Sequence, residues 1–273
     1  MGKLSTLQIK QFQKRIYDYY NQNGRKLPWR KTINPYHILV SEIMLQQTQA
    51  NRVTEKHRQF IKKFPTFISL ANASLSDIYR VWQGMGYNRR ALYLKKIAGI
   101  IESQYMGKMP ETAKQLDKLP GIGYNTASAI VAFAYNQPAV FIETNIRAVF
   151  IHEFFAEKEA IDDKDIVPLI KQALDVKNPR IWYWALMDYG SYLKKSYSHL
   201  LRKSKHYTKQ SEFKGSDRQI RGNILKLLAL HKSLTGLDIG SMLSVDADRI
   251  TQQLRVLRKE GFIKKKGSVF QLS

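Results

Sequence analysis

The 273-residue chain contains no cysteine. This absence excludes disulfides, thiolate nucleophiles, zinc sites with cysteine ligands and cysteine-held iron–sulfur clusters. Long apolar runs are also missing: none approaches the ~18–20 residues of a membrane span, and the N-terminal segment lacks a signal-peptide core. We therefore expect a cytoplasmic protein that has no membrane partner.

Acidic residues are scarce beside basic ones. The chain has 22 Asp and Glu against 45 Lys and Arg, which gives a net charge of +23. This excess indicates a polyanionic partner, most simply nucleic acid. An apolar content of 44% with 25% charged residues is typical of a globular chain and excludes wholesale disorder.

Helical periodicity dominates the first two thirds of the sequence. Ser5 and Gln8 fit a capping box at the start of a helix that runs to Tyr20, and Asn34-Pro35 fits the start of the next helix. Glycine and proline separate the segments that follow. Further helices are predicted over 50–63, 75–83, 89–105, 111–117, 124–135, 164–174 and 178–195.

The last third begins with a composition shift. Residues 194–216 are polar and basic, which predicts a linker or a basic arm. After it we expect three helices, over 217–231, 235–243 and 246–260, and a β-hairpin whose turn is Lys264-Lys265-Lys266-Gly267. This is the winged-helix pattern, in which the third helix enters the major groove and the wing touches the backbone. A small helical packing domain is the alternative, and the partner could be DNA or a protein.

A short glycine-containing turn joins two of the predicted helices. It reads Leu119-Pro120-Gly121-Ile122-Gly123, and its glycines permit a tight turn with positive φ. Amide N–H groups at the start of the following helix suit a phosphate. A plain helix–helix turn is the alternative reading of this helix-hairpin-helix motif.

The region from Tyr17 to Gly190 resembles the helix-hairpin-helix DNA glycosylases, and among them the adenine DNA glycosylases (the MutY family). The resemblance implies an all-α, two-lobed helix-hairpin-helix glycosylase fold over residues 1–193. Composition and periodicity add a basic linker over 194–216 and a small winged-helix (α+β) domain over 217–273. The segments that carry it are Leu27-Pro28-Trp29, Ser41-Glu42-Ile43-Met44-Leu45-Gln46-Gln47-Thr48-Gln49, Trp82-x-Gly84-x-Gly86-Tyr87, Leu119-Pro120-Gly121-Ile122-Gly123, Asn145-Ile146-Arg147-Ala148-Val149 and Ala185-Leu186-Met187-Asp188-Tyr189-Gly190.

The resemblance implies a monofunctional enzyme of base excision repair. It would flip adenine, mispaired with guanine or 8-oxoguanine, out of double-stranded DNA and hydrolyse its N-glycosidic bond. We expect a monomer of bacterial type, associated with the nucleoid. Two alternatives stay open: the same fold acting on thymine or uracil opposite guanine, and a non-catalytic DNA-binding protein. The pair Glu42 and Glu143 argues against the second alternative, because a protein that only binds DNA does not need carboxylates that face its phosphates.

Two carboxylates are the predicted catalytic groups. Glu42 lies in an apolar helix, where burial would raise its pKa, and the resemblance makes it the general acid that protonates a purine ring nitrogen. A structural ion pair is the alternative. Glu143 stands where the family has an aspartate that stabilises the cationic sugar, and its extra methylene could alter geometry or substrate. A surface glutamate satisfied at a helix N-terminus is the alternative for Glu143. Asn145 matches a residue that supports the site by hydrogen bonding.

Other residues are predicted to contact DNA. Asn125 stands where bifunctional relatives carry a lysine nucleophile. Because asparagine has no nucleophilic amine, water would be the nucleophile here. Asn125 could also merely cap the helix. Gln46, Gln47 and Tyr87 are candidates to fill the gap left by a flipped nucleotide, although core packing is an alternative for Tyr87. Asn88 replaces a second tyrosine. The hairpin contacts are Leu119, Gly121, Gly123, Asn125 and Thr126.

The chain departs from the family that it resembles in two larger respects, its lack of cysteines and its C-terminal domain. The family usually holds an iron–sulfur cluster on four cysteines after the segment that matches Met187-Asp188-Tyr189-Gly190, whereas this chain continues Tyr192-Leu193-Lys194-Lys195. We therefore expect a clusterless member with no metal ligands, with room for a monovalent cation at the hairpin. The winged-helix candidate stands where the family has a larger domain that reads 8-oxoguanine.

Overall fold

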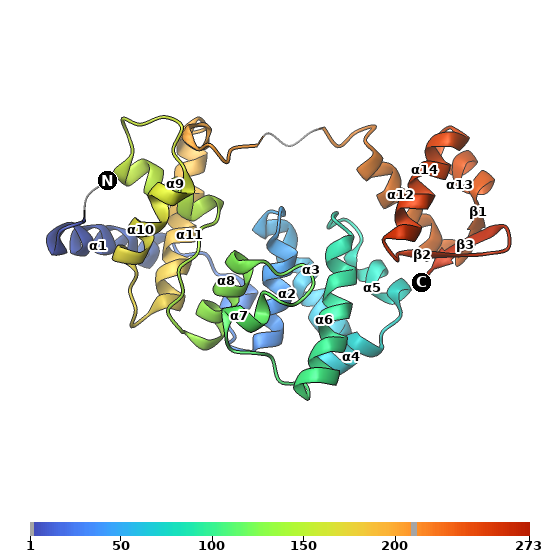
Figure 1. Cartoon of the computed structure of the whole chain (residues 1–273), viewed down its shortest axis with the longest axis horizontal. Coiled ribbons are helices and arrows are strands. Elements are labelled where there is room, and N and C mark those ends of the chain that lie inside the picture. The colour runs from blue at the N-terminus through green and yellow to red at the C-terminus, as the bar shows by residue number, and fades with distance from the viewer. Residues whose placement is uncertain (1–2, 209–211) are drawn as a thin grey trace. The chain divides into compact units, whose positions relative to one another are not determined.

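A computed structural model describes residues 3–208 and 212–273 (Figure 1). The chain forms two compact units: unit 1 comprises residues 1–42 and 110–209, and unit 2 comprises residues 43–109 and 210–273. The first boundary between them falls inside helix α2 (Pro35–Leu45). Among the described residues, no helix combines the length and the apolar character that crossing a bilayer requires.

Unit 1 is helical, as the sequence predicts. Helix α1 begins at the Ser5 capping box, in which the Gln8 amide donates to Ser5 Oγ at 3.2 Å and the Ser5 amide donates to Gln8 Oε1 at 2.8 Å. The Tyr36 amide donates to Asn34 Oδ1 at 2.9 Å, which caps α2. Besides α2, the elements of unit 1 are α1 (Thr6–Asn23), η1 (Pro28–Arg30), α7 (Ala113–Leu116), α8 (Tyr124–Tyr135), α9 (Thr144–Phe154), α10 (Asp163–Ala173), α11 (Pro179–Ser196) and η2 (Leu200–Lys203).

Helices α9 and α11 pack together in the core of unit 1 (Figure 1). Helix α9 is not among the predicted helices, because its buried residues from Ala148 to Ile151 are consecutive and give no clear 3.6-residue period. Gly190 of α11 lies directly against α9: a Cβ there would stand 2.1 Å from the Asn145 carbonyl oxygen. Only glycine permits this approach, which fixes α11 against the first turn of α9.

Unit 2 begins with four helices. One of them, α4, was not predicted; it is a short helix that starts at a capping box between Thr66 and Ser69. The helix predicted over 75–83 ends at Trp82, one residue early. The four elements are α3 (Ala50–Lys63), α4 (Phe67–Asn72), α5 (Leu75–Trp82) and α6 (Arg89–Tyr105).

The C-terminal part of unit 2 contains three helices and a small sheet. The strands pair antiparallel in the order β1-β3-β2. The predicted hairpin turn is wrong in one respect: Lys264, Lys265 and Lys266 lie in strand β2, because the chain reverses after them at Gly267 and Ser268. The elements are α12 (Asp217–His231), β1 (Ser233–Thr235), α13 (Gly236–Leu243), α14 (Ala247–Lys259), β2 (Ile263–Lys266) and β3 (Val269–Leu272). This order of elements is typical of winged-helix modules.

The segment after α11 packs onto unit 1 for part of its length. Leu200 of η2 is buried in the core, and the amide of Ile161 donates to the Lys203 carbonyl at 2.8 Å. Residues 209–211 of the predicted linker lie outside the described residues. The division into residues 1–193, 194–216 and 217–273 stays a prediction.

Candidate active site

Glu42 lies near the C-terminal end of α2, a helix that is apolar almost all round. Its neighbours Ile38, Leu39 and Ile43 are buried. Burial raises the pKa of the Glu42 carboxyl to about 8; the negative charge of Glu143 adds to this rise, and the positive charge of Arg30 opposes it. At neutral pH the Glu42 carboxyl is therefore mostly protonated and can donate a proton.

Arg30 is held in place by Asp188 of α11. Its Nη1 and Nη2 atoms each donate to the Asp188 carboxylate at 2.8 Å, and its guanidinium lies 5.5 Å from the Trp184 ring centroid. Burial acts to raise the pKa of Asp188, but hydrogen bonds and charges from Arg30 and Arg25 outweigh it and hold the pKa below its ordinary value. This ion pair fixes a cation whose field reaches Glu42, and the sequence analysis did not assign that role to Arg30.

Glu143 is the N-cap of α9. Its Oε1 atom accepts hydrogen bonds from the amides of Asn145 and Ile146, both at 2.9 Å, and its Oε2 atom accepts one from Asn145 Nδ2 at 3.1 Å. Both oxygens are thus fixed at the positive end of the helix. Asn145 supports the carboxylate directly, through its backbone and its side chain.

Asn125 and Lys194 flank the segment that carries Glu143. Asn125 does not cap α8: its Oδ1 atom accepts a hydrogen bond at 3.3 Å from the amide of Ile142, the residue before Glu143. Lys194 lies one turn beyond Gly190 on α11. Burial lowers the pKa of Lys194, the charge of Glu143 raises it and the charge of Arg25 lowers it. Lys194 was not singled out as a site residue, because only the packing of α11 on α9 brings it into the field of Glu143.

The hairpin joins α7 to α8 within unit 1. Gly121 has φ of +78°, as the motif requires, and Gly123 is the N-cap of α8. Leu119 is buried, so its side chain anchors the turn, whereas Asn125 is exposed. The first turn of α8 has no acidic residue and no side-chain cap. Its amide N–H groups, which include that of Thr126, therefore point toward a place where an anion is favoured.

The residues predicted to fill the DNA stack lie in two loops of unit 2. Gln47 has φ of +56° and Tyr87 has φ of +48°, a left-handed conformation that costs free energy in residues other than glycine. Tyr87 is 40% exposed, so the alternative of core packing is wrong. Gln47 is exposed, and Gln46 and Asn88 are half-buried.

Arg90, which the sequence analysis missed, ties these two loops together. This buried side chain donates to the carbonyls of Met44 at 2.7 Å, Met85 at 3.1 Å and Gln46, and its guanidinium lies 5.3 Å from the Tyr87 ring centroid. Burial lowers the pKa of Arg90 to about 10. The Arg90 guanidinium thus donates to carbonyls of both loops and so stabilises the loops that contain Gln47 and Tyr87. No local pattern in the sequence reveals such long-range bonding.

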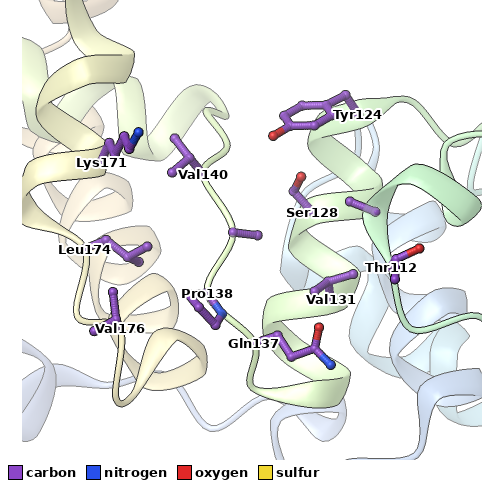
Figure 2. A pocket seen from close by; sticks show the side chains of 12 residues that line it. Thr112, Tyr124, Ser128, Val131, Gln137, Pro138, Val140, Lys171, Leu174 and Val176 are labelled. Carbon is purple, nitrogen blue, oxygen red and sulfur yellow. The ribbon is translucent and has the colours of Figure 1, made fainter.

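Unit 1 has a hollow of about 530 Å³ (Figure 2). Val131, Val140 and Leu174 line it, together with Tyr124, the first residue of α8. Neither Glu42 nor Glu143 is among its lining residues. The hollow therefore does not coincide with the candidate active site.

The chain does not fit the iron–sulfur cluster that its resemblance to the adenine glycosylases raises. It has no cysteine to supply thiolate ligands. Within residues 3–208 and 212–273, no group of three or more His, Asp or Glu side chains could hold a metal ion. After Gly190, where the resemblance would place the cluster's cysteines, Leu193 and Leu200 pack into the apolar core instead.

The helix-hairpin-helix fold places the chain in a class of base-excision enzymes. The family described as HhH-GPD superfamily base excision DNA repair protein matches residues 40–171. Within this class the chain belongs to the adenine DNA glycosylase family. It is 32% identical to the adenine DNA glycosylase of Mycolicibacterium smegmatis over 232 residues, which cover 78% of each chain.

Other relatives match a shorter region. The adenine DNA glycosylase of Buchnera aphidicola subsp. Baizongia pistaciae is 36% identical over 66% of this chain and 52% of the relative, so the chain spans about half the length of this relative. A solved thermostable thymine-DNA glycosylase matches with a TM-score of 0.60 at 27% identity, over 67% of this chain and 86% of that one. An endonuclease III trapped on DNA matches with a TM-score of 0.59 at 19% identity, which supports the fold alone.

Proposed function

We propose that this chain is a monofunctional DNA glycosylase that removes adenine mispaired with guanine or 8-oxoguanine. The observation that carries the proposal is the pair of carboxyl groups in unit 1: Glu42, with a pKa raised to about 8, and Glu143, held by three hydrogen bonds at the start of α9. Two carboxyl groups whose surroundings differ in this way suit an acid and an electrostatic stabiliser.

In the proposed reaction each carboxyl group has one task. Glu42 donates its proton to a ring nitrogen of the flipped adenine, so that the C1′–N9 bond breaks and its electron pair leaves with a neutral base. The Glu143 carboxylate stabilises the positive charge that develops on the sugar. Water then adds to C1′, and the Glu42 carboxylate left by the first step accepts the proton that this water loses. Asn125 has no amine that could attack in its place.

DNA binding would use both units. Amides at the hairpin and in the first turn of α8 would hold a phosphate. Gln46, Gln47 and Tyr87 would enter the stack, and Asn88 would lie beside the opposite base. A net charge of +23 supports duplex DNA as the partner. We further propose a monomer with no iron–sulfur cluster. A monovalent cation at the hairpin stays a prediction.

The test is base release from duplexes that differ only in one pair. We expect release of adenine opposite guanine or 8-oxoguanine, slower or no release of thymine or uracil opposite guanine, and an intact abasic strand as the product. Preferential release of thymine or uracil would contradict the adenine assignment. High-yield borohydride trapping would contradict the monofunctional assignment, and stoichiometric iron in the purified protein would contradict the clusterless one.

A further inference from the structure

Charge is separated along the winged-helix candidate, residues 217–273. The N-terminal end of α14 has two exposed carboxylates: Asp246, which caps the helix, and Asp248. Six exposed cations gather at its other end and along the next strand, which we call the basic end of the module: Arg255, Arg258, Lys259, Lys264, Lys265 and Lys266. The chain links the two parts of this basic end closely, because the Phe262 amide donates to the Leu257 carbonyl at 2.9 Å.

The positive charge of the basic end is not neutralised by the ion pairs that the structure describes in the module. In the part of the chain that the structure describes, the module's ion pairs join Arg249 to Asp217 and Glu260 to Arg89, and neither uses one of the six cations. Lys265 lies 5.7 Å from the Phe270 ring centroid, a contact that leaves its charge in place. Six unneutralised cations in one region attract a polyanion.

The acidic end of α14 argues against the docking that the sequence analysis expected. A recognition helix that enters the major groove brings its N-terminal residues to the base edges, between two rows of phosphates. Asp246 and Asp248 would meet those phosphates with like charge. The basic end has the opposite sign and suits the phosphate backbone itself.

Contacts within unit 2 tie the basic end to the four-helix part. The rings of Tyr79 in α5 and Phe262 lie 5.8 Å apart, centroid to centroid, and both residues are buried. Arg89 at the start of α6 pairs with Glu260. The basic end thus belongs to the same compact unit as the loops of Gln47 and Tyr87, so a phosphate bound there would add to the contacts of that unit.

We infer that the basic end of the module binds the phosphate backbone of duplex DNA as a second anchor, without reading bases. This inference rests on the proposed function only in taking duplex DNA as the substrate. It predicts a binding contribution that depends steeply on salt and hardly on sequence, because released counterions rather than base-edge hydrogen bonds supply it.

The experiment compares the full chain with the triple variant Lys264→Gln, Lys265→Gln, Lys266→Gln. Dissociation constants for a fully paired duplex and for one with an adenine–8-oxoguanine pair are measured over a range of salt. Each lost phosphate contact changes the slope of log K against log salt by about 0.9, so we expect a slope shallower by about 2–3 for both duplexes. The matched control, Lys10→Gln, Lys171→Gln, Lys177→Gln, removes the same charge from exposed sites of unit 1 and should change the slope less.

The outcomes separate the two proposals. An equal slope change in variant and control, or no change in either, would overturn the DNA-binding role of the basic end; the latter result would favour a protein partner for the module. Loss of affinity for the mispaired duplex alone would also overturn it, because it would indicate base reading. Base release is measured with the same preparations. A wild-type chain that binds DNA through the basic end but releases no base would refute the proposed function and leave this inference standing.

Discussion

At the residue scale, the two carboxyl groups of unit 1 differ because their surroundings differ. Glu42 lies in an apolar helix, where burial and the Glu143 charge favour its neutral form. Glu143 accepts three hydrogen bonds at a helix N-terminus, where donors and the helix dipole suit a carboxylate. The spacing of the two residues in the sequence does not reveal this difference. It arises because Glu42 is surrounded by apolar groups, whereas Glu143 faces the N–H donors of a helix N-terminus.

The pH dependence of base release should report on Glu42. Because its pKa is raised to about 8, the carboxyl carries its proton below that pH and loses it above. We expect the single-turnover rate constant to fall tenfold for each pH unit above about 8. The measurement uses enzyme in excess at fixed ionic strength, so that binding does not limit the rate. A rate that stays level to pH 10 would exclude Glu42 as the proton donor.

Glu42→Gln should lose activity and gain stability. The amide keeps the shape but cannot deliver a proton, so base release should fall by roughly 10²–10⁴-fold. In the wild-type chain the folded state binds a proton that the unfolded state has lost between pH ~4.5 and ~8, so its stability falls as pH rises through this window. The gain in melting temperature of the variant should therefore be larger at pH 8 than at pH 5. An equal gain at both would mean that the Glu42 pKa is not raised.

Substitutions of Glu143 test its charge and its length separately. Glu143→Gln removes the negative charge and should slow base release by about 10²–10³-fold. Glu143→Asp keeps the charge but withdraws the carboxylate by one methylene from the position fixed by Asn145 and Ile146, and we expect a smaller loss. Both variants should still bind DNA, because phosphate contacts dominate affinity. Full activity of the Gln variant on every mispair would remove Glu143 from the reaction.

At the element scale, the sequence predicted the long helices that have a polar face or a capping signal. It missed α4, which has a capping box but only six residues, and α9. The Ser5 and Asn34 caps fixed the starts of α1 and α2, and Gly121 marked the hairpin. Helix α9 has four consecutive buried residues, from Ala148 to Ile151, and gives no clear period to detect. The Arg90 bonds were equally invisible, since the carbonyls of Met44, at the end of α2, and of Met85 lie some forty residues apart in the chain.

Gly190→Ala should disturb the first turn of α9. Alanine is the better helix former by about 1 kcal/mol, so an unobstructed site would be stabilised. Here the new Cβ would stand 2.1 Å from the Asn145 carbonyl oxygen, so α11 and α9 must separate. We expect a net destabilisation of about 1–3 kcal/mol in urea unfolding, with slower base release because α9 carries Glu143. Gly99→Ala, in α6 with nothing within 4 Å of its Cβ position, is the control that should not destabilise. A stabilised Gly190 variant would contradict the close packing.

At the scale of the whole molecule, composition predicted a polyanionic partner but not where the charge lies. The excess of 45 basic over 22 acidic residues is a property of the full chain. The sequence places the first carboxylates of the helix predicted over 246–260 before its cations, but only contacts such as Tyr79 with Phe262 tie residues 217–273 to the helices of 43–109. The polar and basic composition of the linker suggested that residues 217–273 form an independent module. Their contacts with residues 43–109 join positions far apart in the sequence and leave no local signal that could have corrected this prediction.

Removing residues 217–273 should separate DNA affinity from chemistry. The catalytic candidates Glu42, Glu143 and Asn145 belong to unit 1, so the single-turnover rate constant at saturating enzyme should stay within a few-fold of the full chain. Affinity for DNA should fall, since the deleted segment has eleven Lys and Arg against five Asp and Glu. The truncation also exposes Tyr79, which Phe262 covers in the full chain, so about 2 kcal/mol of burial and roughly 4–8 °C of melting temperature should be lost. A truncated chain that melts as the full chain does would mean that residues 217–273 do not pack on α5. A folded one whose rate constant collapses even at saturating enzyme would mean that the module takes part in the chemistry.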